Sequence, residues 1–185
     1  MNASGNTFPQ IVLRSTDLDF PDDLPTGHGR YTEFEPIARG AKAELRSCWD
    51  PVMGRRVAMK TLRSEFARDE TERRRFLREA RITAQLQHPA TVPVYEIGLY
   101  DGDCLYFTMK CIAGEDLFKV LQRLSWKDRV TDQAFPRERL VDIAIQAAQA
   151  CAYAHVHGVV HRDLKPENIW VGLFGEVIVL DWGVA

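Results

Sequence analysis

The sequence predicts an α+β fold in which a strand-rich first half holds one helix and a more helical second half follows. Short apolar runs separated by turn residues recur between residues 31 and 110, as in neighbouring antiparallel strands. Residues 69–87 and 138–157 instead carry apolar or small side chains about every 3.6 residues, which is typical of helices with one buried face. The order of these patterns indicates a sheet with one helix, then a mainly helical part.

The composition favours a globular protein and does not suggest nucleic acid or an anionic membrane as a partner. Of 185 residues, 45% are hydrophobic and 27% charged, with a net charge of −2, enough for one domain or two small lobes. No apolar run approaches the roughly 18 residues of a membrane span, and the N-terminus lacks the pattern of a signal peptide. The four cysteines show no zinc-type spacing, so we expect reduced thiols and a cytoplasmic location.

Residues 1–29 are expected to form a mostly disordered arm. They contain three prolines, three glycines and four aspartates between residues 17 and 23, and such segments bury too little apolar surface to fold. The apolar run 11–13 leaves open the alternative of a docking peptide.

Five strands are expected between residues 31 and 110. They are predicted at 34–37, 43–48, 56–60, 91–95 and 104–110. The turns between them are residues 39–42, residues 50–55 and a hairpin through 98–103. The helix 69–87 stands between the third and fourth strands and is followed by the dipeptide His88-Pro89, which ends it.

The second half is predicted to be mainly helical. A short helix is expected at 115–124, a polar connection at 125–136 and a long helix at 138–157, which Gly158 ends. The stripe of the long helix consists of Leu140, Ile143, Ala144, Ala147, Ala148, Cys151 and Ala154. The apolar runs 159–160 and 177–180 are interpreted as buried strands.

Polar functional side chains are concentrated around these last two runs. Asp163, Lys165 and Asn168 lie between them, and Asp181 follows the second. Magnesium-dependent phosphoryl transfer needs a carboxylate near the acceptor hydroxyl, a cation for the developing charge and oxygen ligands for the metal. These four residues fit those roles, and the alternative is a turn with incidental charges.

The same residues carry a family resemblance. Residues 161–168 read H-R-D-L-K-P-E-N, which resembles the catalytic loop H-R-D-L-x-x-x-N of eukaryotic-type protein kinases. Residues 181–183, D-W-G, are similar to the metal-binding D-F-G, with Trp182 in place of phenylalanine. The chain looks closest to bacterial kinases of this type, and Lys165 is typical of the serine/threonine class.

The resemblance implies the two-lobed protein-kinase fold, with a complete N-terminal sheet lobe and a partial, mainly helical C-terminal lobe. The kinase domain would then span 30–185, with the small lobe at 30–110, the hinge at 111–114 and the large lobe at 115–185. The chain stops two residues after the D-W-G motif, so we expect a truncated domain. The helix 138–157 would lack its covering helices, and its bare face, including Leu140 and Ile143, would favour self-association.

Site residues follow from the resemblance position by position. Lys60 would hold the α- and β-phosphates and Glu79 would orient Lys60. Asp163 would accept the hydroxyl proton and Lys165 would stabilise the transferred phosphoryl group. Asn168 and Asp181 would bind Mg²⁺ beside ATP.

The remaining ATP-binding positions rest on alignment with Lys60. The glycine-rich loop falls on Ala38, Gly40, Ala43 and Leu45, where only the middle glycine is kept, so a weakened phosphate clamp is expected. The adenine side would be formed by Ala58, Met109 and Cys111.

The resulting hypothesis is an ATP-dependent serine/threonine protein kinase, which transfers the γ-phosphoryl group of Mg-ATP to a protein hydroxyl. Its partners would be ATP and a protein substrate with a serine or threonine hydroxyl. The alternative is a non-catalytic, kinase-derived module that binds a nucleotide or another protein.

Overall fold

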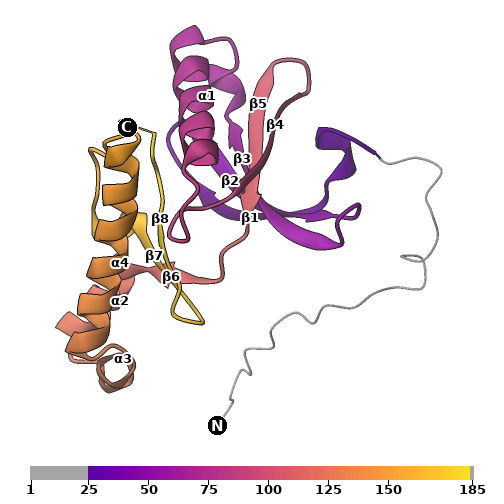
Figure 1. Cartoon of the computed structure of the whole chain (residues 1–185). Helices are drawn as coiled ribbons and strands as arrows, with labels where there is room; N and C mark the ends of the chain where they lie inside the picture. Colours follow the sequence, from indigo (N-terminus) through magenta and orange to yellow (C-terminus); the bar gives the residue numbers. More distant parts are fainter. Residues whose placement is uncertain (1–24, 184–185) are drawn as a thin grey trace.

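A computed structural model describes residues 25–183 as two antiparallel sheets with helices packed beside them (Figure 1). The larger sheet has five strands in the order β1-β2-β3-β5-β4, and α1 lies against it. The smaller sheet has three strands in the order β6-β7-β8, and α4 runs beside it. The predicted α+β class is confirmed.

The five-stranded sheet is built from the first half of the chain, as predicted. Its strands are β1 (Thr32–Arg39), β2 (Ala43–Asp50), β3 (Arg55–Leu62), β4 (Val94–Tyr100) and β5 (Cys104–Lys110). Strand β3 is central and pairs with β2 on one side and β5 on the other. Most of its residues are buried as a result.

The fourth strand differs from the prediction. It starts at Val94 rather than at residue 91 and runs through Gly98 to Tyr100, so the hairpin turn shrinks to residues 101–103. The ring of Tyr106 on β5 lies over Gly98, where a Cβ atom would come within 2.7 Å of it. Gly98 is therefore a close-packing position inside a strand, whereas its sequence context favoured a turn.

Helix α1 (Glu70–Gln85) docks on the sheet through aromatic packing. Asp69 caps its first turn by accepting hydrogen bonds from the backbone N–H groups of Thr71 and Glu72. Phe76 on the helix and Phe107 on β5 are buried with ring centroids 5.2 Å apart. Through this core, α1 is oriented so that the side that carries Glu79 faces β3.

The second half contains more elements than predicted. They are β6 (Gly114–Asp116), α2 (Leu117–Ser125), α3 (Arg129–Ala134), α4 (Arg137–Val156), β7 (Ile169–Gly172) and β8 (Val177–Val179). Short 3-10 helices lie at His28–Arg30, Ser64–Phe66 and Pro166–Asn168.

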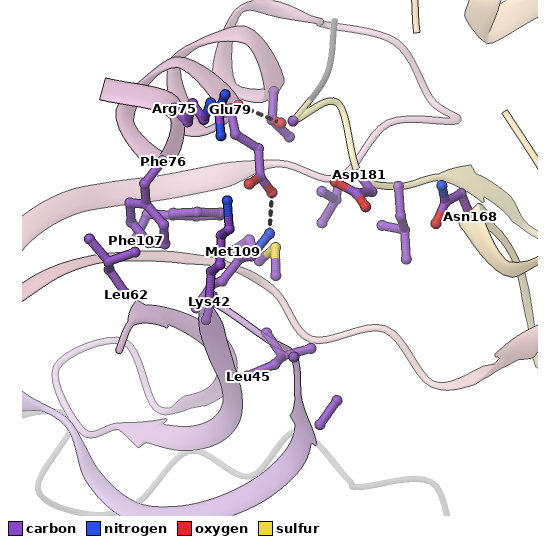
Figure 2. A pocket seen from close by; sticks show the side chains of 18 of the residues that line it. Lys42, Leu45, Leu62, Arg75, Phe76, Glu79, Phe107, Met109, Asn168 and Asp181 are labelled. Atoms are coloured by element: carbon purple, nitrogen blue, oxygen red, sulfur yellow. Dashed lines mark hydrogen bonds and ion pairs between the residues drawn. The ribbon is translucent and has the colours of Figure 1, made fainter. Parts of the chain in front are cut away.

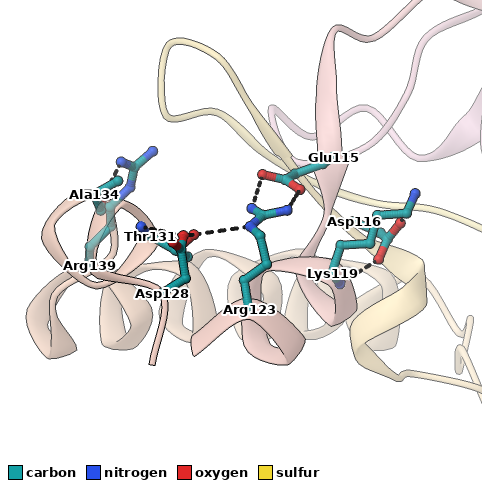
Figure 3. Close-up of polar contacts among 8 residues, drawn as sticks. All are labelled: Glu115, Asp116, Lys119, Arg123, Asp128, Thr131, Ala134 and Arg139. Atoms are coloured by element: carbon teal, nitrogen blue, oxygen red, sulfur yellow. Dashed lines mark hydrogen bonds and ion pairs between the residues drawn. The ribbon is translucent and has the colours of Figure 1, made fainter. Parts of the chain in front are cut away.

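Helix α3 occupies the stretch 125–136, which was wrongly predicted to be only a polar connection. Asp128 caps it by accepting from the backbone N–H of Thr131 at 3.0 Å. The Arg123 guanidinium joins Thr131, at 3.0 Å, to both carboxylate oxygens of Glu115 (Figure 3). A six-residue helix held by a cap and by tertiary contacts has too few residues to show a helical period.

The run 159–160, interpreted as a buried strand, is not one. Val160 is 49% exposed and Val159 is only partly buried. The strand lies instead at β7, which pairs with β6 on one side and β8 on the other. An apolar dipeptide does not reveal which segment finds a partner, because pairing depends on residues far away in the sequence.

The face of α4 that we expected to be bare is partly covered. Ile143 is 2% exposed, and Leu140 packs against the same core. The covering groups are Ile169 and Val179 of the smaller sheet and the ring of Trp182. The prediction for Ile143 was wrong because it left out the contribution of the chain's own strands to this core.

A different face of α4 is exposed. Val141 and Ile145 are 49% and 48% exposed, and Val156 at the end of the helix is 85% exposed. Self-association through an uncovered face of α4 stays a prediction. The exposed apolar face is the one that carries Val141 and Ile145. Within residues 25–183, no helix is long and apolar enough to cross a membrane.

The expected arm lies mostly outside the described residues. Residues 25–29 are described, and the His28 ring stacks on Tyr100 of β4 with centroids 4.5 Å apart. Arg30 forms an ion pair at 3.0 Å with Asp50, which is fully buried at the end of β2. The domain boundaries proposed from the sequence stay predictions.

The aromatic core between α1 and the sheet gives a stability prediction. Phe76→Ala should lower the free energy of unfolding by about 3–5 kcal/mol, because it removes a buried ring and leaves a cavity. The matched control is Phe118→Ala, since Phe118 is 44% exposed on α2 and its loss should cost well under about 1 kcal/mol. Urea unfolding followed by circular dichroism measures both, and equal losses would contradict the proposed core.

Candidate active site

A cleft of about 950 Å³ lies between the five-stranded sheet with α1 and the segment that follows α4 (Figure 2). Nine of the predicted site residues line it: Ala38, Gly40, Ala43, Leu45, Lys60, Glu79, Met109, Asn168 and Asp181. They come from both halves of the chain, so the tertiary fold brings together side chains that are far apart in the sequence.

One wall of the cleft carries an ion pair between β3 and α1. Lys60 lies on β3 opposite Leu45 of β2 and Phe107 of β5. Its Nζ contacts Glu79 Oε1 at 2.5 Å, and the two side chains are 24% and 14% exposed. The pairing expected between Lys60 and Glu79 is thus present, and its partial burial strengthens it relative to a surface pair.

Gly183 separates two carboxylates at one end of the cleft. A Cβ atom on this residue would lie 3.1 Å from Asp181 Oδ1 and 3.3 Å from Glu79 Oε2. A larger residue would therefore crowd both carboxylates. From the sequence, Gly183 was predicted only as part of the D-W-G motif and had no role of its own.

Two residues of the site have left-handed backbone conformations. Arg162 has φ of 63° and Asp181 has φ of 61°, a region that residues other than glycine seldom adopt. Such conformations cost free energy and persist only where surrounding contacts enforce them. Arg162 bends the chain directly before Asp163, and Asp181 bends it at a predicted site residue itself.

His161 provides contacts that hold this arrangement. Its Nε2–H donates to the carbonyl of Leu180 at 2.9 Å, since a carbonyl can only accept, and its Nδ1 accepts from the Asp163 N–H at 3.3 Å. The ring is 2% exposed and lies 4.6 Å from that of Trp182. His161 therefore ties the loop before Asp163 to the strand end before Asp181, a role that was not predicted from the sequence.

Asn168 is oriented by Asp163. Its Nδ2 donates to the Asp163 backbone carbonyl at 2.9 Å and to Oδ2 at 3.3 Å. Because the backbone carbonyl cannot donate, this contact fixes which end of the amide is nitrogen. The side-chain oxygen of Asn168 is left available for a cation.

The donor set suits magnesium better than a transition metal. Among residues 25–183, no group of three or more histidines, cysteines, aspartates and glutamates is placed to hold a metal. Mg²⁺ keeps several waters and needs only one or two protein oxygens besides phosphate oxygens. The oxygens of Asn168 and Asp181, which line the same cleft, fit that requirement.

Asp163 and Lys165 lie beside the cleft, in contact with each other. The Lys165 Nζ is 2.8 Å from Asp163 Oδ2, and both side chains are exposed by more than 40%. The hydrogen bond between them lowers the pKa of the Asp163 carboxyl and raises the pKa of the Lys165 ammonium. Asp163 is therefore ionised at neutral pH and linked to the cleft through Asn168.

The residues predicted to lie beside the adenine are located near the C-terminal end of β5. Ala58 is buried on β3 and pairs in register with Met109, which lines the cleft. Cys111 follows β5, and burial raises the pKa of its thiol. Neither Ala58 nor Cys111 is among the residues that line the cleft, so their contact with a nucleotide stays a prediction.

The chain has clear relatives among bacterial kinases. It is 37% identical over 166 residues to the serine/threonine-protein kinase PknD of Protochlamydia amoebophila, covering 88% of this chain and 17% of that protein. It is 41% identical over 160 residues to PknD of Chlamydia muridarum, covering 84% and 17%. The chain thus spans 17% of the length of these relatives.

Solved structures and a family model agree with these relatives. The crystal structure of the Mycobacterium tuberculosis PknI kinase domain is similar with a TM-score of 0.64 and 28% identity, covering 86% of this chain and 62% of that one. This likeness confirms the two-lobed kinase fold expected from the sequence. The model of the protein kinase domain matches residues 31–185, and the chain therefore belongs to the protein kinase domain family.

Proposed function

We propose that the chain is the nucleotide-binding part of an ATP-dependent serine/threonine protein kinase. One observation carries the proposal: a single cleft holds the Lys60–Glu79 ion pair together with the oxygens of Asn168 and Asp181. A cation and two hard oxygen ligands around one cavity are what a magnesium triphosphate requires.

Lys60 binds the α- and β-phosphates in this proposal. Glu79 fixes the ammonium in place, and α1 carries Glu79 because Phe76 anchors that helix in the core. Asn168 and Asp181 hold the metal, which when bound neutralises charge on the phosphate oxygens. The loop of Ala38, Gly40, Ala43 and Leu45 covers the phosphates, and Ala58, Met109 and Cys111 lie toward the adenine.

Asp163 and Lys165 act on the acceptor. The oxygen of a serine or threonine hydroxyl forms a bond to the γ-phosphorus, while the bond from that phosphorus to the β–γ bridging oxygen breaks and ADP leaves. The ionised Asp163 orients the hydroxyl and takes its proton. Lys165, in contact with Asp163, compensates charge on the transferred phosphoryl group.

The partners in this proposal are ATP and a protein with a serine or threonine hydroxyl. All four cysteines, which lie in the described part of the chain, are free thiols. Free thiols accord with a reducing compartment, and we place the protein in the cytoplasm. The non-catalytic alternative gains no support, because every side chain that the chemistry requires is present.

The contact between Asp163 and Lys165 gives a titration prediction. Lys165→Met should raise the pKa of the Asp163 carboxyl toward that of an unpaired aspartate, because the hydrogen bond that lowers this pKa is lost. Carboxyl carbon NMR measures the shift. Lys119→Met, which removes the partner of Asp116 on α2, is the control and should leave Asp163 unchanged. An unmoved Asp163 in Lys165→Met would disprove the coupling.

Nucleotide binding tests the cleft directly. Mg-ATP should raise the melting temperature of the chain, and Lys60→Met should weaken ATP binding by at least about tenfold, since it removes a charge-assisted contact. Asp181→Asn should reduce the magnesium dependence of the shift, because it removes the negative charge of one of the two oxygen ligands. Lys127→Met, on the exposed turn before α3, is the matched control. A shift that both site variants retain would place the nucleotide elsewhere.

Phosphoryl transfer tests the assignment of Asp163. Asp163→Asn should lower transfer to peptide hydroxyls by roughly 10²–10⁴-fold, because the amide cannot accept the proton. Asp132→Asn, on the exposed side of α3, should retain wild-type rates. Radiolabelled products should contain phosphoserine or phosphothreonine. Retained activity in Asp163→Asn, or phosphotyrosine as the product, would contradict the proposal.

A further inference from the structure

The loop between β1 and β2 is hydrogen-bonded to one arginine, Arg63, which follows β3. The Arg63 Nη1 donates to the carbonyls of Ala41 at 2.8 Å and Gly40 at 3.3 Å. The backbone N–H of Arg63 donates to the carbonyl of Lys42 at 3.0 Å. Three consecutive loop carbonyls thus point at a single residue.

Arg63 is itself rigidly placed. It follows Leu62, which is 2% exposed in the core between α1 and the sheet. Its own side chain is 22% exposed and forms an ion pair with Glu65 through Nη2. Arg63 therefore holds the loop from a fixed position.

The direction of these carbonyls determines the direction of the amides. The carbonyls of Gly40, Ala41 and Lys42 point toward Arg63, which does not line the cleft, whereas Gly40 and Lys42 do line it. In a planar trans peptide, the N–H points opposite to the C=O of the same unit. The N–H groups of Ala41 and Lys42 consequently point away from Arg63, and among residues 25–183 neither donates to any acceptor. Lys42 lines the cleft and Ala41 stands between two residues that line it.

The loop is also tied to α1 and closed on itself. Lys42 Nζ contacts Glu72 Oε1 at 2.6 Å, and Glu72 is mostly buried in the first turn of that helix. The Gly40 N–H donates to the Ala43 carbonyl at 2.9 Å, and a Cβ atom on Gly40 would approach that oxygen to 3.3 Å. The loop therefore has a defined shape although two of its three expected glycines are alanines.

We propose that Arg63 is a positioning residue that aims the Ala41 and Lys42 amides at the phosphates of the nucleotide. This inference rests on the proposed function. Free backbone N–H groups that face one cavity form an anion-binding site. Arg63 sets the direction of these N–H groups through its hydrogen bonds to the loop carbonyls. The loop therefore depends less on glycine residues for its shape than a loop that lacks such hydrogen bonds.

The fork of the guanidinium is essential to this role. Arg63 reaches two loop carbonyls and a carboxylate at once, whereas a lysine ammonium is a compact point charge on a flexible stem. Arg63→Lys therefore keeps the positive charge near the cleft but loses the paired hydrogen bonds to the loop carbonyls. This variant separates loop orientation from simple attraction between a cation and the phosphates.

The experiment compares ATP with adenosine by calorimetry, with magnesium present. Arg63→Gln and Arg63→Lys should each weaken ATP binding by about tenfold and leave adenosine binding within about twofold, because adenosine has no phosphates for the amides to bind. Arg68→Gln is the matched control, since Arg68 is 91% exposed just before α1, pairs with Asp103 and does not line the cleft. It should leave both affinities unchanged.

Hydrogen exchange without nucleotide gives a second readout. Both Arg63 variants should exchange faster at the Gly40 amide, which donates to the Ala43 carbonyl inside the loop, while α1 and β3 keep wild-type rates. Equal losses for ATP and adenosine would indicate a general structural role and overturn the proposal, as would wild-type ATP affinity in Arg63→Lys. A wild-type chain that binds adenosine and ATP equally would instead refute the proposed phosphate site as a whole.

Discussion

The ion pair between Lys60 and Glu79 is the contact on which the geometry of the cleft depends. It joins the central strand of the larger sheet to α1, and it is partly withdrawn from water. Partly buried charges are expensive to separate, because each would be left without a partner in a medium of low polarity. The pair therefore couples the placement of α1 to the placement of Lys60.

The opposite wall depends on hydrogen bonds rather than on ion pairs. His161 bridges two loops through both of its ring nitrogens, and Asn168 is oriented by the backbone of Asp163. These contacts enforce the left-handed conformations of Arg162 and Asp181. The ring of Trp182, 1% exposed, completes the wall by filling the core beside α4. This wall is rigid because its polar groups are hydrogen-bonded and lie next to a buried apolar core.

The site residues differ in how far they were predictable. The segment 161–168 and the motif 181–183 are each continuous in sequence, so the order of their residues alone indicates their chemistry. Gly183, His161 and Arg63 had no assigned role because each acts on residues distant in the chain. Gly98 was interpreted as part of a turn, and only the ring of Tyr106 above it explains the residue.

The sequence by itself determined the fold class, the number of strands in the larger sheet and the residue types of the candidate site. These features are encoded by local periodicity and by motifs whose members are neighbours. Only the tertiary structure decided which face of α4 is buried, where β7 pairs and how the loop at 40–42 is held. Those outcomes depend on contacts between segments far apart in the chain, such as Ile143 with Val179 and Arg63 with Ala41, and no local pattern records them.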